Sequence, residues 1–258
     1  MKLTSYWLDT SEPFRSAATG PVQGSCDVAV IGGGLTGSSA ALALAKKGAR
    51  VVLLEAETVG NAASGRNGGM CNNGFAQDYG MLSAKLGKDV ANRLYRAFDA
   101  GVDMVERLVA QEKINCSFAR VGKIKLAAKP EHYDKLARSQ AMLAASVDPD
   151  THMVSRAELE NEVGSKRYYG GLVYGKSAGM HVGRFVRGLG EAAARHGVEI
   201  HEHTPMTALR RAPGGQEIET PKGRLHAKQV LLASGTSHTG PLGWIRRRIV
   251  PVGAFLIV

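Results

Sequence analysis

The chain has 258 residues, of which 44% are hydrophobic and 22% are charged, and its formal net charge at pH 7 is +10. These values are ordinary for a globular protein of one or two domains, and they exclude a disordered chain or a fibre. No apolar run reaches the roughly 18 residues that a membrane helix needs, so we expect no integral membrane segment.

The basic residues are spread along the sequence, and their densest run is only residues 246–248. Scattered positive charge is typical of a solvated surface, so we expect no nucleic-acid partner. Residues 1–24 lack the apolar core of a signal peptide, and the three cysteines are odd in number and far apart. These features predict free thiols in a reducing, cytoplasmic compartment.

The first predicted unit is a strand, a turn, a helix and a second strand. Residues 27–31 form a short apolar run typical of a strand covered on both faces, and 38–47 carry apolar residues at helical spacing. Gly48 is placed to end the helix, and a second strand is predicted over 50–55. Together these segments predict a βαβ unit.

The rest of the chain alternates predicted helices and strands around one long loop, which favours the α/β fold class. Residues 59–80 are rich in small and polar residues and predict an ordered loop of a length that is usually functional. The predicted helices cover 89–111, 130–145 and 184–196. The predicted strands cover 120–128, 168–174, 198–203, the hairpin region 206–226 with a turn at 213–215, 228–233, and the apolar run 249–258.

Three glycines stand between the first strand and the first helix in the spacing Gly-x-Gly-x-x-Gly. Gly32 permits the tight turn, Gly34 lets the backbone approach a pyrophosphate, and Gly37 lets the helix and strand pack closely. The N-terminus of the helix then offers N–H groups to the phosphates. Glu55 ends the second strand, where a carboxylate accepts hydrogen bonds from a ribose. This combination predicts a dinucleotide-binding site, because glycines that served only a turn would leave Glu55 unexplained.

The small-residue loop at 62–70 bears on which dinucleotide is bound. The Ser64 hydroxyl and the backbone amides of the loop are suited to a pyrophosphate, and its glycines let a planar ring system approach. The loop therefore favours FAD over NAD. An NAD-linked dehydrogenase remains a third interpretation, which the loop disfavours.

These motifs resemble the FAD-dependent amine and amino-acid oxidoreductases of the D-amino-acid oxidase and glycine oxidase type. Within them the sequence looks most similar to the gamma-glutamylputrescine oxidase-like proteins. The resemblance extends over nearly the whole chain, and the Ser-Gly-Arg-Asn-Gly-Gly stretch at 64–69 is its most specific part. Other matching segments are 5–7, 122–127, 169–172, 187–189, 233–235 and 248–252.

The resemblance implies an FAD site. It places Leu35 and Thr36 at the pyrophosphate and Ala63 with Ser64 at the phosphates. It places Ala56 with Glu55 at the adenosine ribose, and Met206 at the adenine through its backbone. Gly68, Gly69 and Met70 are placed along the flavin ring, and Ala233, Ser234 and Gly235 around the nucleotide pocket. Arg66 and Asn67 are the candidates for groups near the ring. No catalytic residue and no metal ligand is nominated.

The resemblance also implies the domain organisation and the reaction. A Rossmann-like FAD/NAD(P)-binding domain is expected from 1–112 and 165–243, and a partial α+β substrate-binding domain from 113–164 and a return strand in 244–258. The expected reaction oxidises the C–N bond of an amine or amino acid to an imine, with gamma-glutamylputrescine-like compounds among the candidate substrates. Oxygen or another acceptor would reoxidise the flavin.

Family chains continue well beyond the last residue of this sequence, which matches about their first three-fifths. The alternative hypothesis is therefore a non-catalytic, truncated or split FAD-binding fragment, whose other half would be a second chain.

Two further groups of residues could suggest a metal site or a covalent flavin link, but neither is assigned one. His201 and His203 lie two apart on a predicted strand, a spacing that suits a metal. No third ligand is evident, so a solvent-facing polar strand is the preferred interpretation. Cys71 follows the glycine-rich loop and is interpreted as a small buried residue rather than as a point of covalent flavin attachment.

Overall fold

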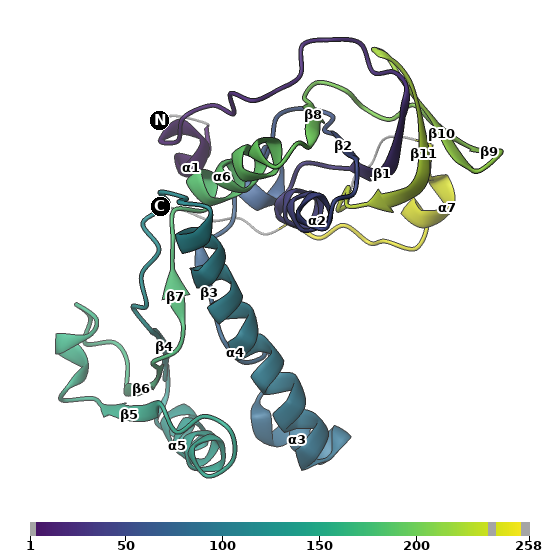
Figure 1. Cartoon of the computed structure of the whole chain (residues 1–258). Coiled ribbons are helices and arrows are strands. Elements are labelled where there is room, and N and C mark those ends of the chain that lie inside the picture. Colours follow the sequence, from purple (N-terminus) through teal and green to yellow (C-terminus); the bar gives the residue numbers. More distant parts are fainter. Residues whose placement is uncertain (1–3, 237–240, 254–258) are drawn as a thin grey trace. The chain divides into compact units, whose positions relative to one another are not determined.

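The computed structural model describes residues 4–236 and 241–253 (Figure 1). The chain folds as two compact units, each built from separated stretches of sequence. The first unit comprises Met1–Gly68, Glu112–Cys116 and His181–Val258, and the second comprises Gly69–Gln111 and Ser117–Met180.

The boundaries of these units differ from those of the predicted domain segments. Residues 69–111 and 165–180 belong to the second unit, whereas the sequence grouped them with the cofactor-binding part. The reason is strand pairing within the second unit. β3 (Met70–Cys71) pairs with β7 (Ala178–Gly179), and β6 (Gly170–Tyr174) is the middle strand of a separate small sheet.

A six-stranded sheet forms the centre of the first unit, in the order β8-β2-β1-β11-β10-β9. Its strands are β1 (Ser25–Ile31), β2 (Val51–Leu54), β8 (Glu199–His201), β9 (Ala208–Ala212), β10 (Gly215–Thr220) and β11 (Gly223–Leu232). The pairs from β8 to β11 are parallel, and β9, β10 and the start of β11 form an antiparallel meander. The predicted α/β fold class is confirmed.

Both faces of the sheet are covered. The helices α2 (Leu35–Lys46) and α6 (Val182–Arg195) pack side by side on one face (Figure 1). Val30 points towards α2, where its side chain lies against Gly37. The alternation of side chains along β1 sends Ala29 and Ile31 to the opposite face. There the buried core contains Val22, Cys26, Ala29, Ile31, Val52, Leu54, Met206, Ile218, Leu225 and Ala227.

The short segment Glu112–Cys116 is fixed to the helices of the first unit by a buried carboxylate. The side chain of Glu112 is only 6% exposed, and Oε1 lies 2.5 Å from Lys46 Nζ on α2. Oε2 lies 3.3 Å from Nε2 of His196 and 3.7 Å from Nη2 of Arg195, at the end of α6. The hydrogen bond from Lys46 is the main reason that the pKa of Glu112 is lowered. Glu112 therefore joins this segment to both helices.

The second unit contains a three-stranded antiparallel sheet in the order β4-β6-β5. Its new elements are β4 (Lys123–Leu126), β5 (Thr151–Ser155), α3 (Tyr79–Leu86), α4 (Lys88–Gln111) and α5 (Pro130–Ala144). α5 packs on the sheet through Leu136, which meets Leu172 of β6 in a small core. α3 and α4 share a second core, in which Tyr79 and Tyr95 pack edge to face.

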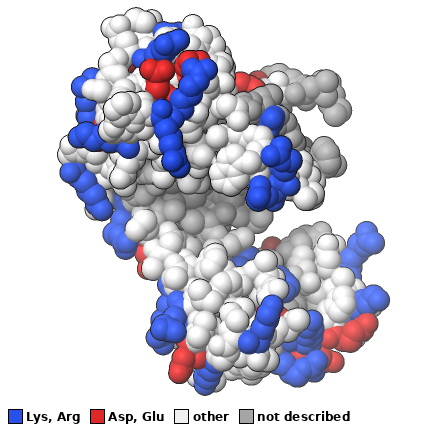
Figure 2. All heavy atoms as spheres, turned by 90° about the vertical axis from the view of Figure 1, so that its right-hand side faces the viewer, with Lys and Arg blue, Asp and Glu red and all other residues white. Residues whose placement is uncertain are grey.

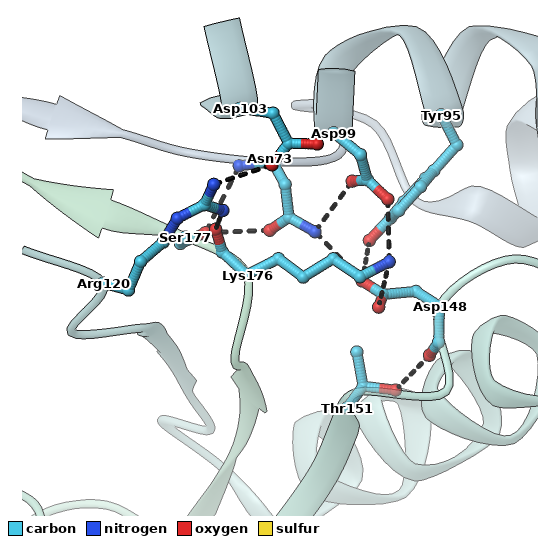
Figure 3. A network of polar contacts seen from close by, with 9 residues as sticks. All are labelled: Asn73, Tyr95, Asp99, Asp103, Arg120, Asp148, Thr151, Lys176 and Ser177. Atoms are coloured by element: carbon cyan, nitrogen blue, oxygen red, sulfur yellow. Dashed lines mark hydrogen bonds and ion pairs between the residues drawn. The ribbon is translucent and has the colours of Figure 1, made fainter. Parts of the chain in front are cut away.

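A buried polar network ties α4 of the second unit to its loops (Figure 3). Asp148 is fully buried and accepts hydrogen bonds through Oδ2 from Tyr95 at 2.9 Å and from Asn73 at 3.0 Å. Lys176 Nζ lies 3.2 Å from Asp148 Oδ1 and 2.9 Å from Asp99 Oδ2. Burial and the carboxylate of Asp148 raise the pKa of the Tyr95 phenol. A single lysine thus neutralises much of the charge of two carboxylates.

Lys176 is held as a cation by the same contacts. Desolvation acts to lower the pKa of Lys176, but its hydrogen bonds to Asp99 and Asp148 raise it overall. Arg120 extends the network by donating to the carbonyl oxygen of Lys176 at 2.8 Å and to Asp103 at 2.7 Å.

The expected strand over 249–258 is wrong where the structure describes it. Residues 249–253 have no regular secondary structure, and a short helix, α7 (Gly243–Arg246), precedes them. Val250 and Val252 are 83% and 87% exposed, and a strand needs a neighbouring backbone to pair with. The remainder of that segment, 254–258, lies outside the described residues.

Within residues 4–236 and 241–253, no helix combines the length and the apolar character needed to span a membrane. On the visible face of each unit, Lys and Arg side chains occur in small separate groups with Asp and Glu among them (Figure 2).

Candidate cofactor site

Several of the predicted site residues meet at the carboxyl edge of three adjacent parallel strands. Ile31 at the end of β1 pairs with Leu54 of β2 and with Leu232 of β11. The next residues, Gly32, Glu55 and Ala233, therefore lie beside one another although they are far apart in sequence. Hydrogen bonds continue past the strand ends, from the Gly32 N–H to Leu54 O at 2.9 Å and from the Ala233 N–H to Ile31 O at 2.8 Å.

The glycine turn between β1 and α2 has no room for side chains on its inner side. Gly32 has φ of +111°, a conformation that favours glycine, and an added Cβ would lie 2.6 Å from Ala233 O. A Cβ on Gly37 would clash with the carbonyl oxygen of Gly32, and a Cβ on Gly34 would lie 2.7 Å from Ser64 Oγ. The geometry agrees with the tight turn predicted at Gly32 and the close packing predicted at Gly37, and the pyrophosphate contact of Gly34 stays a prediction.

The carboxylate of Glu55 faces the glycine turn. Its Oε2 accepts a hydrogen bond from the Gly33 N–H at 2.6 Å, and its Oε1 accepts one from the Glu57 N–H at 2.9 Å. A carboxylate has about four acceptor positions, so two remain for further donors. Glu55 is thus fixed at the turn by two backbone amides and is still able to accept hydrogen bonds from sugar hydroxyls.

Ser64 connects the loop after β2 to the N-terminus of α2. The residue lies in a short 3₁₀ helix, Ala63–Gly65, and its Oγ accepts a hydrogen bond from the Leu35 N–H at 3.0 Å. The preceding residue, Gly34, caps α2 without a side chain. The next amides of the first turn, including that of Thr36, have no carbonyl partner within the helix.

Arg66 and Asn67 stabilise the loop. The Arg66 side chain is exposed and donates from Nε to Asn61 O at 2.6 Å. Asn67 donates from Nδ2 to Ser64 O at 3.1 Å and to Ala63 O at 3.3 Å. Both side chains hold the backbone of the loop, and the roles predicted for them near the flavin ring stay predictions.

The remaining predicted residues are distributed as follows. Ala56 and Gly68 lie on exposed backbone of the first unit, Ser234 and Gly235 follow Ala233 past the end of β11, and Gly69 and Met70 belong to the second unit. Met206 is buried in the core on the sheet face opposite α2. Met70 lies in β3 and its side chain is 67% exposed. The roles predicted for these residues stay predictions.

The histidine pair and Cys71, to which the sequence assigned no site, both differ from the interpretation given to them. His201 is fully buried and pairs through Nε2 with Glu199 Oε1 at 2.6 Å, while His203 follows β8 with φ of +51°. The solvent-facing polar strand is therefore wrong, because β8 is an edge strand whose His201 points into the unit. Cys71 is partly rather than fully buried, and burial raises the pKa of its thiol. In the described part of the chain, no group of three His, Cys, Asp or Glu residues is arranged to hold a metal.

Sequence reasoning missed the N-terminal residues that contact the loop. Ser5 donates from Oγ to Gly65 O at 2.9 Å, and Trp7 donates from Nε1 to Asn67 O at 2.5 Å. Both residues belong to a segment that matched the family, but nothing in their spacing indicated a contact with residues sixty positions away.

The backbone at this edge fits the diphosphate of a dinucleotide. The crowded glycine turn excludes side chains and the α2 N-terminus presents amides. Anions bind readily at such an N-terminus, because its N–H groups are exposed and the helix dipole is positive there. The Glu55 carboxylate lies beside the turn and keeps two acceptor positions after its hydrogen bonds from Gly33 and Glu57.

Comparisons with known proteins identify the family of the chain. Residues 27–258 match the family model described as DAO, FAD dependent oxidoreductase. The chain is 30% identical to a probable oxidoreductase OrdL of Haemophilus influenzae, over 98% of this chain and 60% of that protein. It is 28% identical to the gamma-glutamylputrescine oxidoreductase of Escherichia coli, over 92% of this chain and 55% of that protein.

Solved structures show the same fold. The glycine oxidase of Geobacillus kaustophilus aligns with a TM-score of 0.66 and 24% identity, over 83% of this chain and 56% of its own. The L-amino acid deaminase of Proteus myxofaciens aligns with a TM-score of 0.71 and 21% identity, over 86% and 48%. The chain thus spans about half to three-fifths of the proteins that it resembles. Because the family model matches nearly the whole sequence, the chain belongs to the DAO family of FAD-dependent oxidoreductases, and the predicted cofactor, FAD, is confirmed.

Proposed function

We propose that this protein binds FAD at the carboxyl edge of β1, β2 and β11 and oxidises the C–N bond of an amine or amino acid to an imine. The observation that carries the proposal is the joint placement of the glycine turn, Glu55 and Ser64 at that edge. The names of its relatives, among them a gamma-glutamylputrescine oxidoreductase and glycine oxidases, support this substrate class.

The diphosphate would be held mainly by backbone groups. The amides of Thr36 and Gly37 lie in the first turn of α2, where the helix dipole favours negative charge. Ser64 uses Oγ as an acceptor for the Leu35 N–H, so its own hydroxyl proton remains for a phosphate oxygen.

The adenosine ribose would be held by Glu55. Hydrogen bonds from Gly33 and Glu57 fix its carboxylate in one orientation before the ligand arrives. A preorganised acceptor loses little conformational entropy on binding, so each hydrogen bond to the sugar contributes more to affinity. Met206, Ala233, Ser234 and Gly235 remain our proposed contacts to the adenine and the rest of the nucleotide.

Bound FAD supplies the acceptor for the two electrons and the proton of the C–N oxidation, and the protein supplies binding and orientation. In this proposal the second unit provides the substrate-binding α+β domain, with its β4-β6-β5 sheet. Gly68, Gly69 and Met70 would line the flavin ring.

The test is a binding and turnover experiment with the purified protein. We expect the FAD-free protein to take up FAD with a change in the visible flavin spectrum and a quenching of flavin fluorescence. A panel of amines and amino acids, with a glutamylated diamine among them, is then scored for anaerobic bleaching of the flavin and for peroxide release in air. Failure to bind FAD under any reconstitution condition would contradict the proposal.

A second candidate is an FAD-binding piece that needs another chain for catalysis. It is favoured by the partial span of 60% and 55% over the first two relatives. This candidate predicts that the protein binds FAD tightly but that no amine bleaches the flavin. Bleaching by an amine after a second polypeptide is added would favour this candidate over the first.

We also propose that the protein works in the reducing cytoplasm. Cys26, Cys71 and Cys116 form no disulfide in the described structure. Mass spectrometry of protein denatured in the presence of an alkylating agent directly on cell lysis is expected to find all three cysteines modified, the buried Cys26 and Cys116 included. A disulfide between any two of them would contradict this location.

A further inference from the structure

The N-terminal helix α1 (Tyr6–Asp9) is too short to be stable by itself, because an isolated helix of one turn does not recover the cost of nucleation. It buries none of its four residues. Its order must therefore come from its contacts, and in the first unit these lead to the loop after β2 and to the start of α6.

On one side, α1 and the residue before it hold the backbone of the loop. Ser5 donates from Oγ to Gly65 O at 2.9 Å, and the indole N–H of Trp7 donates to Asn67 O at 2.5 Å. Leu8 packs on Gly65 so closely that a Cβ there would lie 2.8 Å from Leu8 Cδ2. Three successive contacts therefore fix residues 65–67, directly after Ser64.

On the other side, α1 is anchored to the N-terminus of α6 through His181. The His181 ring packs edge to face with the Trp7 ring at 4.9 Å between centroids. His181 Nδ1 accepts a hydrogen bond from the Arg184 N–H at 3.2 Å, and Nε2 lies 2.9 Å from Thr10 Oγ1. Since Nδ1 is an acceptor, the ring proton sits on Nε2 and is donated to Thr10.

Ser11, which follows α1 in the sequence, and Arg187 of α6 complete the anchor. Ser11 donates from Oγ to Trp7 O at 2.7 Å, and Arg187 Nη1 donates to Ser11 O at 2.7 Å and to Ser11 Oγ at 2.6 Å. The backbone of Trp7 also lies against Gly183, where a Cβ would meet Trp7 O. The indole is thus held between a rigid helix and the loop.

We propose that α1 is a clamp that holds the loop at residues 64–67 in the conformation that receives the diphosphate of FAD, with Trp7 as its positioning residue. The inference rests on the proposed FAD site. Ser64 reaches the α2 N-terminus only while residues 65–67 keep their place. A loop that is ordered for part of the time binds with an affinity reduced by that fraction, so loss of the Trp7 hydrogen bond weakens FAD binding without removing any group that touches FAD.

The experiment compares Trp7→Phe with the matched control Tyr6→Phe. Trp7→Phe keeps an aromatic ring and loses the N–H donor, whereas Tyr6→Phe loses a hydroxyl from a neighbouring ring that is 51% exposed. From the value of one such hydrogen bond, we expect Trp7→Phe to raise the Kd for FAD about 5-fold in a fluorescence titration. Tyr6→Phe is expected to bind as the unmodified protein does. Ser5→Ala is a milder second variant, which tests the clamp should Trp7→Phe fold poorly.

A second measurement does not depend on flavin. Arg66 is exposed within the clamped loop and is followed by Asn67, so trypsin can cut there once the loop opens. In FAD-free protein we expect Trp7→Phe to be cut after Arg66 several times faster than Tyr6→Phe. Saturating FAD is expected to restore the protection, because ligand binding and loop order are coupled reciprocally.

The outcomes separate the clamp from the proposed function. Faster cleavage with unchanged FAD affinity would overturn the clamp, because the order that Trp7 gives to the loop would then have no effect on FAD binding. Equal cleavage in Trp7→Phe and Tyr6→Phe would also overturn it. If the unmodified protein failed to bind FAD, the proposed function itself would fall, and the clamp with it. A 5-fold loss of affinity in Trp7→Phe beside normal binding by the unmodified protein and Tyr6→Phe would support both.

Discussion

The carboxylate of Glu55 accepts a hydrogen bond from the backbone N–H of Gly33 at 2.6 Å, across the ends of two adjacent parallel strands. The acidic residue at the end of β2 therefore has a place in the protein before any ligand binds. The contact orients the carboxylate and also holds the glycine turn in shape.

Replacement of this carboxylate should weaken FAD binding. Glu55→Gln exchanges an acceptor oxygen for an NH₂ group that cannot accept from the Gly33 or Glu57 N–H. Hydrogen bonds to charged groups contribute about 1.5–3 kcal/mol, so we expect the Kd for FAD to rise about 10-fold or more. Titration of flavin fluorescence measures this Kd. Glu57→Gln is the control, since the Glu57 side chain is exposed. Similar affinities in the two variants would contradict the assigned role of Glu55.

Crowding at the glycine turn predicts a loss of stability. In Gly37→Ala, the new methyl group meets the carbonyl oxygen of Gly32, which is backbone and cannot turn aside. Overpacking of this kind costs about 1–3 kcal/mol, so urea unfolding of the first unit should begin at lower concentration. Gly20→Ala is the control, because nothing lies within 4 Å of a Cβ at Gly20. An unfolding midpoint for Gly37→Ala equal to that of Gly20→Ala would mean that the turn can open to admit a side chain.

The ion cluster around Glu112 predicts a dependence of stability on pH. The pKa of Glu112 is lowered from its ordinary value of 4.5, first by the hydrogen bond from Lys46. The unfolded chain therefore takes up the proton at higher pH than the folded one. The contribution of Glu112 to stability is complete above pH 4.5 and is lost as the pH falls through the lowered pKa.

Glu112→Gln tests this dependence. At neutral pH we expect the variant to be about 2 kcal/mol less stable than the unmodified protein, since the hydrogen bonds that cationic partners make to a charged, buried carboxylate are lost. The difference should shrink as the pH drops below 4.5 in urea unfolding experiments. Glu12→Gln, at a pair whose side chains are 76% and 81% exposed, is expected to change little at any pH. A Glu112→Gln difference that stays constant from neutral to acid pH would show that Glu112 does not stabilise the fold through its charge.

In the second unit, Lys176 is expected to matter far more than an ordinary surface lysine. Lys176→Met leaves Asp148, which is fully buried, and Asp99 without their cation. Breaking such a pair costs about 3 kcal/mol, which hydrogen exchange of α4 amides would measure within the unit. Lys166→Met removes an exposed pair with Glu160 and should cost less than about 1 kcal/mol. Equal protection of the α4 amides from hydrogen exchange in both variants would contradict a stabilising role of Lys176 in the polar network.

The cofactor edge could be predicted from sequence because its determinants are local. Gly32, Gly34, Gly37 and Glu55 lie within one βαβ unit, and the close approach of backbone atoms there admits few other residue types. The long helices were also predicted nearly to their ends, since α4 and α6 carry strong apolar periodicity.

Other features depend on contacts that no local pattern encodes. His201 looks like part of a polar strand, yet it is buried because β8 lies beside β2. The apolar run after residue 248 looks like a strand, but its described part has no neighbour to pair with. The short elements α3 and β5 were missed because they are brief and are ordered by packing and pairing within the second unit. The clamp by Trp7 joins residues sixty positions apart.

The position of β1 between β2 and β11 has a consequence for synthesis of the chain on the ribosome. β2 emerges soon after β1, but β11 follows about two hundred residues later. Until then one side of an apolar central strand has open hydrogen-bonding groups, and such an edge is prone to wrong pairing with other chains. The nascent protein should therefore depend on chaperones until residues 226–232 have emerged and can pair with β1.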